Sequence, residues 1–193
     1  MRKLAISALL LIMALSAVSE KGMAQTRRLG FGAYAGYAMN MDFSKMFGLF
    51  NGGAAGAVLS YGASNLALEG GIGFAGVEDP FVTRTDRVWK RDAAVRQYRA
   101  SVLYSYSAVR RPEWGLGPAL KASSAFTCNP QVAVDEYLTL YSVQAGCTGS
   151  YHLCTLKNAD CFLCPAVFAG ADYNPGCGWA PSFSFGIAFA IGK

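Results

Sequence analysis

Six cysteines and a single histidine are the residues of this 193-residue chain best suited to redox, metal or nucleophilic chemistry. An even number of cysteines favours disulfide bonds in an exported protein. Cys161 and Cys164 have the spacing of a redox or zinc motif, but no second cysteine pair with that spacing accompanies them. We therefore predict disulfide bonds, no metal site and no cofactor. The cysteines are Cys128, Cys147, Cys154, Cys161, Cys164 and Cys177.

One turn predicts the first disulfide. Lys157 and Asn158 are expected to form a two-residue hairpin turn, which places Cys154 directly opposite Cys161. Directly opposed residues of antiparallel strands have Cα atoms about 4.5–5.5 Å apart, within reach of a disulfide. The same turn sets Leu156 opposite Ala159 and Thr155 opposite Asp160.

The other four cysteines are less constrained. Cys128 and Cys177 are expected in loops at the same end of the sheet, so they are candidates for a second bond. Cys147 and Cys164 are expected to face outward on adjacent strands, but at positions offset along the ladder. No bond is predicted between these two, because opposed residues are needed.

His152 and Ser150 suggest a second kind of chemistry. A histidine can activate a neighbouring serine hydroxyl for nucleophilic attack, and these residues share one face of an expected strand. No third partner that would orient the histidine is evident in the sequence. We predict a protein without enzymatic activity, and keep a lipid-modifying hydrolase that uses His152 as an alternative.

Three charged residues are expected inside the fold. Glu69, Arg99 and Lys121 fall on the inward faces of three consecutive strands. Buried charges are costly unless they are paired, so we predict an interior ionic cluster. Such a cluster serves either as structural filling or as a gate or relay. We favour filling, because the lumen of a small barrel is normally packed with side chains.

The last stretch of the chain shows which elements must hold these residues. From Trp179 to Ile191, every second residue is large and apolar apart from Pro181, and the residues between are small or polar. Successive side chains of a strand point to opposite faces, so this strand has one bulky apolar face and one slim face. The slim row carries no charge, which suits a narrow lumen with the aromatic row facing lipid.

The same alternation recurs along the chain, with no helical period. Its earlier segments are 29–38, 53–61, 66–74, 94–106, 114–126, 137–154 and 161–172. Long loops at 40–51 and 77–92 follow odd-numbered strands, and a tight turn at 62–65 follows an even-numbered one. This pattern predicts an all-β fold: a closed, antiparallel, up-and-down transmembrane β-barrel of about eight strands.

Composition and the N-terminus agree with export to a membrane. Charged residues make up 15% of the chain, below the usual quarter. The basic residues behind the +5 net charge are scattered along the chain, which excludes the clustered basic surface of a nucleic-acid-binding protein. A basic start at residues 1–3 precedes an apolar run, Leu4 to Val18. We predict a signal peptide at residues 1–24, cleaved after Ala24, and a barrel domain at residues 25–193.

Two segments carry a family resemblance. The order GAVLSYGASNLALEGGIGF, a tyrosine-rich strand and then WGLGPALKAS resembles the small outer-membrane β-barrel (porin-family) proteins of bacteroidete type. The resemblance spans residues 29–193 and implies a barrel fold and a bacterial outer-membrane location.

These observations together predict a non-enzymatic, monomeric, integral outer-membrane barrel that contacts membrane lipid. Its loops at 40–51 and 77–92 would be offered to an extracellular ligand or protein. Two alternatives remain open. One is a barrel-type outer-membrane lipid-modifying hydrolase using His152. The other is a secreted, soluble, disulfide-bonded β-barrel that binds an apolar ligand, whose aromatic rows would face inward.

Overall fold

A computed structural model describes residues 29–42, 49–76, 81–82, 88–89, 94–128, 137–157, 159–175 and 178–192. The predicted signal peptide, Cys177 and most of the two long loops lie outside these residues. Within the described part of the chain, no helix has the length and apolar character needed to cross a membrane.

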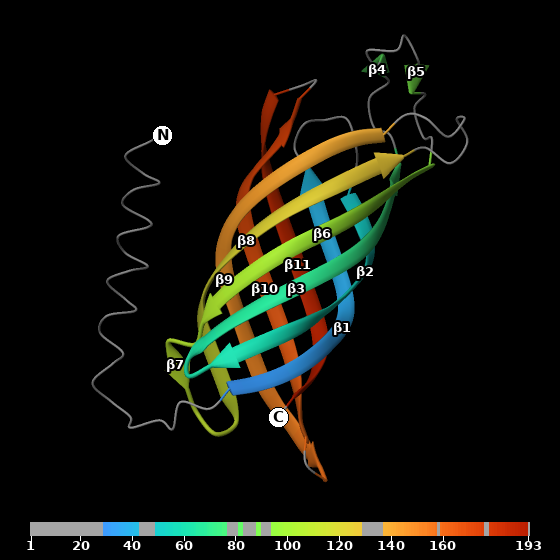
Figure 1. The fold of residues 1–193 in the computed structure, drawn as a ribbon. Coiled ribbons are helices and arrows are strands. Elements are labelled where there is room, and N and C mark those ends of the chain that lie inside the picture. Colours follow the sequence, from blue (N-terminus) through green and yellow to red (C-terminus); the bar gives the residue numbers. More distant parts are fainter. Residues whose placement is uncertain are drawn as a thin grey trace, which may run out of the picture.

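Eight long antiparallel strands form one sheet that closes on itself (Figure 1). Each pairs with its neighbours along the chain, β6 pairs with β8, and β1 pairs with β11 to close the circle. The predicted closed, up-and-down barrel of eight strands is confirmed. The long strands are β1 (Leu29–Asp42), β2 (Leu49–Tyr61), β3 (Ser64–Gly76), β6 (Ala94–Tyr106), β8 (Trp114–Cys128), β9 (Tyr137–Leu156), β10 (Ala159–Asn174) and β11 (Gly178–Gly192). The short strands are β4 (Phe81–Val82), β5 (Val88–Trp89) and β7 (Val109–Arg110).

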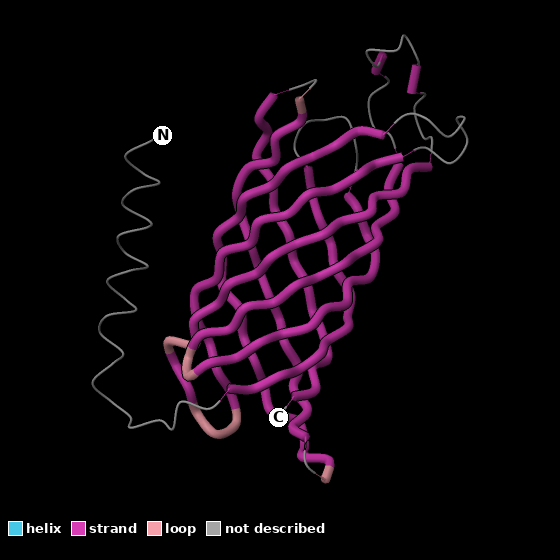
Figure 2. The backbone as a smooth tube through the Cα atoms, in the orientation of Figure 1, coloured by secondary structure: helices cyan, strands magenta, loops and turns pink. Residues whose placement is uncertain are grey.

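The two ends of the barrel differ (Figure 2). At one end, here called the loop end, lie the β1–β2, β3–β6, β8–β9 and β10–β11 connections, including the β4–β5 pair. The other end, the turn end, carries the β2–β3 and β9–β10 turns, the β6–β8 connection with β7, the start of β1 and the end of β11. Gly62 has a φ of 60° at the first position of its two-residue turn, which glycine adopts most readily in such hairpins.

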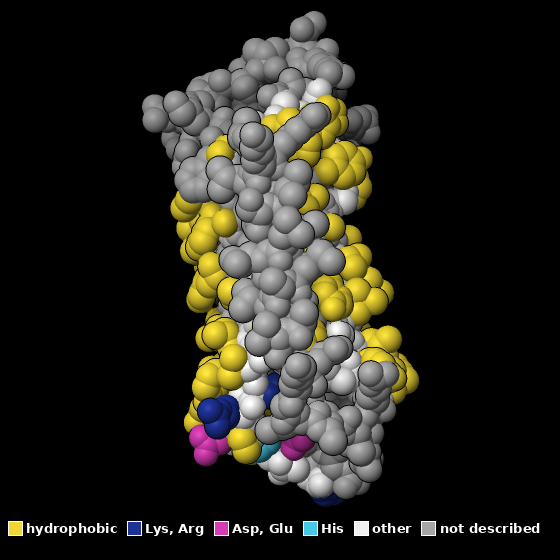
Figure 3. Space-filling view, turned by 90° about the vertical axis from the view of Figure 1, so that its left-hand side faces the viewer, with side chains coloured by type: hydrophobic (Ala, Val, Ile, Leu, Met, Phe, Trp, Pro, Cys, Tyr) yellow, Lys and Arg dark blue, Asp and Glu magenta, His cyan; other side chains and the backbone are white. Residues whose placement is uncertain are grey.

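The outer face of the barrel is apolar. The expected rows face outward, so large side chains such as Trp179, Phe189 and Leu68 are 64–69% exposed. Among the side chains of the eight long strands whose exposure the structure describes, Arg96 is the only charged one that is exposed. Figure 3 shows hydrophobic side chains along the flanks of the barrel and charged ones gathered at the turn end.

The β9–β10 hairpin has the predicted register near its turn, and a bulge beyond it. Cys154 lies opposite Cys161, as predicted. The register then shifts by one residue, so Phe162 lies opposite His152 and Leu153 is the extra residue. A one-residue shift exchanges the two faces of a strand. The prediction that Cys164 faces outward was therefore wrong, since its side chain lines the interior.

Candidate functional site

The lumen has two halves, and the half toward the loop end is filled by polar side chains. Gln144 is 1% exposed, donates a hydrogen bond to Ser182 Oγ at 3.0 Å and accepts one from Ser184 Oγ at 2.9 Å. Gln97 Nε2 donates to Thr127 Oγ1 at 3.2 Å. These buried polar side chains are thus bonded across strands, and we call this region the filled half.

Arg99 belongs to the filled half. Its guanidinium donates to Asn40 Oδ1 at 2.6 Å and to Gln97 Oε1 at 2.9 Å. Phe50, 1% exposed, lies at the same end of the lumen. The sequence grouped Arg99 with Glu69 and Lys121, but the hydrogen bonds of Glu69 join it to Lys121 and Tyr34 instead.

A buried ion pair lies at the border between the halves. Lys121 Nζ is 2.6 Å from Glu69 Oε1, with side chains 8% and 12% exposed. Tyr34 donates to Glu69 Oε2 at 3.1 Å, and the Lys121 ammonium lies 5.7 Å from the centre of the Phe168 ring. Both charges therefore have close partners, as buried charges require. Tyr34 was missed in the sequence, although it is the one large side chain in a row of inward glycines.

Gly56 leaves the space that Tyr34 uses. A Cβ atom on Gly56 would lie 2.8 Å from the Tyr34 ring and hydroxyl oxygen, and 2.4 Å from the Leu68 carbonyl oxygen. Carbon atoms do not approach other heavy atoms so closely, so a larger residue would displace the tyrosine. Gly56 on β2 thereby leaves room for Tyr34 on β1 to reach Glu69.

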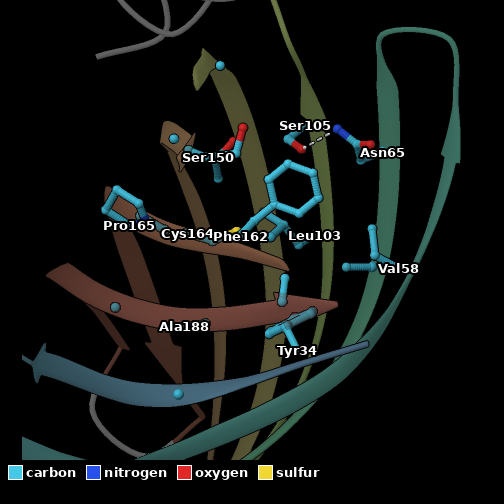
Figure 4. A pocket seen from close by; sticks show the side chains of 18 of the residues that line it. Tyr34, Val58, Asn65, Leu103, Ser105, Ser150, Phe162, Cys164, Pro165 and Ala188 are labelled. Carbon is cyan, nitrogen blue, oxygen red and sulfur yellow. Dashed lines mark hydrogen bonds between the residues drawn. The ribbon is translucent and has the colours of Figure 1, made fainter. Parts of the chain in front are cut away.

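The part of the lumen toward the turn end is hollow, and along β1 and β11 it reaches as far as Asn40 and Ser184, which border the filled half. It holds a cavity of about 670 Å³, walled by glycine and alanine of β1 and β11 and by larger apolar side chains. Figure 4 shows Val58, Leu103, Phe162 and Cys164 around this space, with Asn65 and Ser105 joined by a hydrogen bond of 3.4 Å. We call this region the hollow half. Its volume is typical of small-molecule sites.

A polar cluster lies on the β9–β10 hairpin, which overhangs the turn end because β8 pairs with β9 only as far as Tyr151. Thr155 Oγ1 donates to Asp160 Oδ1 at 2.7 Å, and His152 Nε2 lies 3.4 Å from the same oxygen. The hydrogen bond from Thr155, aided by His152 and opposed by burial, holds the pKa of Asp160 below its ordinary value.

This geometry does not join His152 to Ser150. The hydrogen-bond partners of His152 in the structure are Thr155 and Asp160, together with a backbone bond to Glu113, whereas Ser150 lies in the cavity wall. A serine nucleophile needs its base within hydrogen-bonding reach. Across the described residues, no group of three or more His, Cys, Asp or Glu side chains is arranged to hold a metal ion.

The structure joins none of its five described cysteines in a disulfide bond. The disulfide candidates Cys154 and Cys161 are directly opposed, so the predicted pairing is geometrically available. The other candidate pair, Cys128 and Cys177, is not tested, because Cys177 lies outside the described residues.

Comparison with known structures reveals a shared fold. No protein-family model and no curated protein matches the chain. Neisserial surface protein A matches with a TM-score of 0.53 and 12% identity, over 87% of this chain and 98% of that one. Ail, the attachment invasion locus protein of Yersinia pestis, matches with a TM-score of 0.43, 10% identity and coverage of 85% and 98%. A major outer membrane protein from Thermus thermophilus matches with a TM-score of 0.37, 15% identity and coverage of 84% and 99%. At 12% identity, the likeness to Neisserial surface protein A concerns the barrel fold alone.

Proposed function

We propose that this protein is a monomeric, non-enzymatic barrel of the bacterial outer membrane, exported by a cleaved signal peptide, whose long loops bind an external ligand or partner. The observation that carries the proposal is the apolar outer face of a closed barrel. A soluble protein rarely exposes a continuous apolar surface of this extent, because water solvates it poorly. A bilayer favours it.

Closure of the sheet supports a position within lipid. The hydrocarbon core offers no hydrogen bonds to a free strand edge, so only helices and closed barrels cross it. The eight strands pair in a complete circle. Exposed aromatic residues lie toward both strand ends, with Tyr61 and Trp114 near the turn end and Tyr141 and Trp179 near the loop end. Aromatic side chains in these positions suit the two lipid–water interfaces.

The two alternative functions fit this geometry less well. A soluble carrier of an apolar ligand needs its aromatic rows inside, and the described rows face outward. A hydrolase needs a serine beside His152, and His152 instead contacts Thr155 and Asp160.

The loop end is proposed to face the exterior. Outer-membrane barrels place short turns in the periplasm and longer loops outside. The strand ends that flank residues 43–48, 77–93 and 129–136 lie at the loop end, while the strand ends joined by two-residue turns lie at the other. The binding role assigned to loops 40–51 and 77–92 rests on this orientation.

Membrane fractionation combined with a heat-modifiable gel shift tests the proposal. The protein should appear in the outer-membrane fraction and migrate faster before boiling than after it, since a closed barrel resists detergent. Ile187→Arg on the outer face should cost about 2–4 kcal/mol of unfolding free energy, and inward Gly186→Ser much less. Recovery as a soluble protein without detergent would contradict the membrane assignment.

We propose in addition that Cys154 and Cys161 form a disulfide after export. Their opposed positions on the overhanging hairpin support the bond, and an oxidising compartment would allow it. Peptide mapping under non-reducing conditions should recover Cys154 joined to Cys161. Recovery of Cys154 joined to any other cysteine would overturn the pairing.

A further inference from the structure

The cavity in the hollow half is long. It is lined along β1 from Gly30 to Asn40. Ten residues of strand span roughly 33 Å, which at a strand tilt of about 40° corresponds to roughly 25 Å along the barrel axis. A volume of about 670 Å³ over that length has room for one extended hydrocarbon chain.

This cavity, from here on called the tunnel, is closed at one end. At the inner end, Asn40 accepts the hydrogen bond from Arg99, and the side chains of the filled half lie beyond it. At the outer end, the lining includes Arg110, Arg111 and Glu113, which are exposed at the turn end. A ligand would therefore enter from the turn end and stop at the filled half.

Polarity changes along the tunnel. The apolar side chains of its middle include Val58, Leu103 and Phe162, and the polar Asn65, Ser105 and Ser150 line the same wall. The ion pair of Glu69 and Lys121 also lines the space, but each partner already contacts the other at 2.6 Å, so neither requires a charged group from a ligand. The mouth has two arginines beside two acids, Glu113 and Asp160, the latter already bonded to Thr155.

We propose that the hollow half binds one linear acyl chain of a monoacyl amphiphile with an acidic head group. The chain lies along β1 and β11 with its methyl end toward Asn40. The head lies at the mouth, beside Arg110 and Arg111. A free fatty acid and a monoacyl phospholipid share this chemistry. The site lies at the opposite end from the loops of the proposed function and is independent of what those loops bind.

Binding is measured on the folded protein in nanodiscs of diacyl lipid, with empty nanodiscs as the reference. A fluorescent polyene fatty acid serves as the probe, and saturated fatty acids of increasing length compete with it. Affinity should rise about fourfold for each added methylene and level off once the chain reaches the closed end. A rise without a plateau would place the chains in the surrounding bilayer and overturn the proposal.

Matched substitutions locate the probe. Ala188→Phe fills the tunnel and should weaken binding at least about tenfold, whereas Ala169→Phe on the outer face of β10 should leave binding unchanged. A heat-modifiable gel shift verifies that each variant is a closed barrel. If Ala188→Phe fails to fold, Ala190→Leu provides the same test with a smaller side chain. Equal binding by the inward and outward variants would overturn the proposal.

The head group is tested separately. Arg110→Gln with Arg111→Gln should weaken binding of the fatty acid while leaving the matching fatty alcohol unaffected. Competition by a monoacyl phospholipid at lower concentration than by the fatty acid of equal length would identify the phospholipid as the source, and the reverse order the fatty acid. Failure of both to compete would overturn the proposal, whether or not the protein is found in the outer membrane.

Discussion

The filled and hollow halves of the lumen are built on the same alternating strands, yet they differ in what occupies the space. In the filled half, inward positions carry residues such as Gln144, Thr127 and Ser182, which bond to one another across strands. In the hollow half, many inward positions of β1 and β11 carry glycine or alanine, so the backbone itself forms the wall. Alternation determines which way a side chain faces, and side-chain size then determines whether a lumen is solid.

The border between the halves shows how the two are joined. Lys121 is long enough to reach from β8 past β6 to Glu69 on β3. Tyr34 reaches the same carboxylate from β1. Three strands that are not adjacent are thereby tied together where the packing changes, so we expect this border to dominate the energetics of the interior.

Glu69→Gln should produce the largest effect. It leaves the Lys121 ammonium buried without its counter-charge, and breaking one partner of a buried pair costs about 3–5 kcal/mol. Urea unfolding in lipid vesicles measures the loss. If the border is no more important than either half, the substitution will cost no more than an ordinary polar change.

The matched control neutralises both partners. Glu69→Gln combined with Lys121→Met removes the uncompensated charge, so the double variant should be more stable than Glu69→Gln alone. Additive losses in the two single variants and the double variant would mean that the residues do not stabilise each other.

Overpacking distinguishes the halves directly. Ala125 is 2% exposed in the filled half, so Ala125→Leu should cost about 1–3 kcal/mol. Ala190 lines the cavity, so the same change there has room and should cost less than about 0.5 kcal/mol. The measurement is again unfolding in vesicles, and similar losses at both positions would show that the hollow half is not hollow in the membrane.

The sequence predicts which face of the sheet a residue lies on better than it predicts the residue's height along the barrel axis. Alternation predicts that Glu69, Arg99 and Lys121 face inward, and in the structure the side chains of Lys121 and Glu69 are 8% and 12% exposed. It could not tell that Arg99 lies nearer the loop end, because that depends on register: Glu69 lies opposite Ser101, whereas Arg99 lies opposite Gly71. Register between strands joined by long loops is not encoded in any short segment.

The alternating pattern of the sequence also could not predict the bulge in β9. The turn at Lys157 set the pairing of Cys154 with Cys161, since a two-residue turn leaves one register. The extra residue Leu153 then reversed the faces for the rest of β10, including Cys164. Nothing in the composition of this segment marks the bulged position, because Leu153 fits either face.

Gly56 allows a finer test of how Tyr34 is held at the border. Gly56→Ala should displace the Tyr34 ring and weaken its bond to Glu69, and its Cβ would also press on the Leu68 carbonyl oxygen, so the two contacts together should cost about 1–2 kcal/mol. Gly70→Ala on the outer face is the control, because an added Cβ there meets nothing within 4 Å. Unfolding of the two variants in vesicles gives the comparison. Equal stability would mean that Tyr34 contributes little to the ion pair.

The smallest expected effect lies at the mouth of the hollow half, in the overhanging hairpin. The hydrogen bond from Thr155 holds the pKa of Asp160 below its ordinary value of 3.8. A depressed carboxyl pKa stabilises the folded hairpin above the ordinary value, and this stabilisation is lost as the pH falls through the lower, folded value. Acid should therefore loosen the hairpin locally while the filled half keeps its structure. Thr155→Val removes the main donor, so the midpoint of the Asp160 titration, followed by carboxyl ¹³C chemical shift, should move to higher pH. An unchanged midpoint would show that Thr155 does not hold the carboxylate, and the mouth would then be less ordered than the hydrogen bonds indicate.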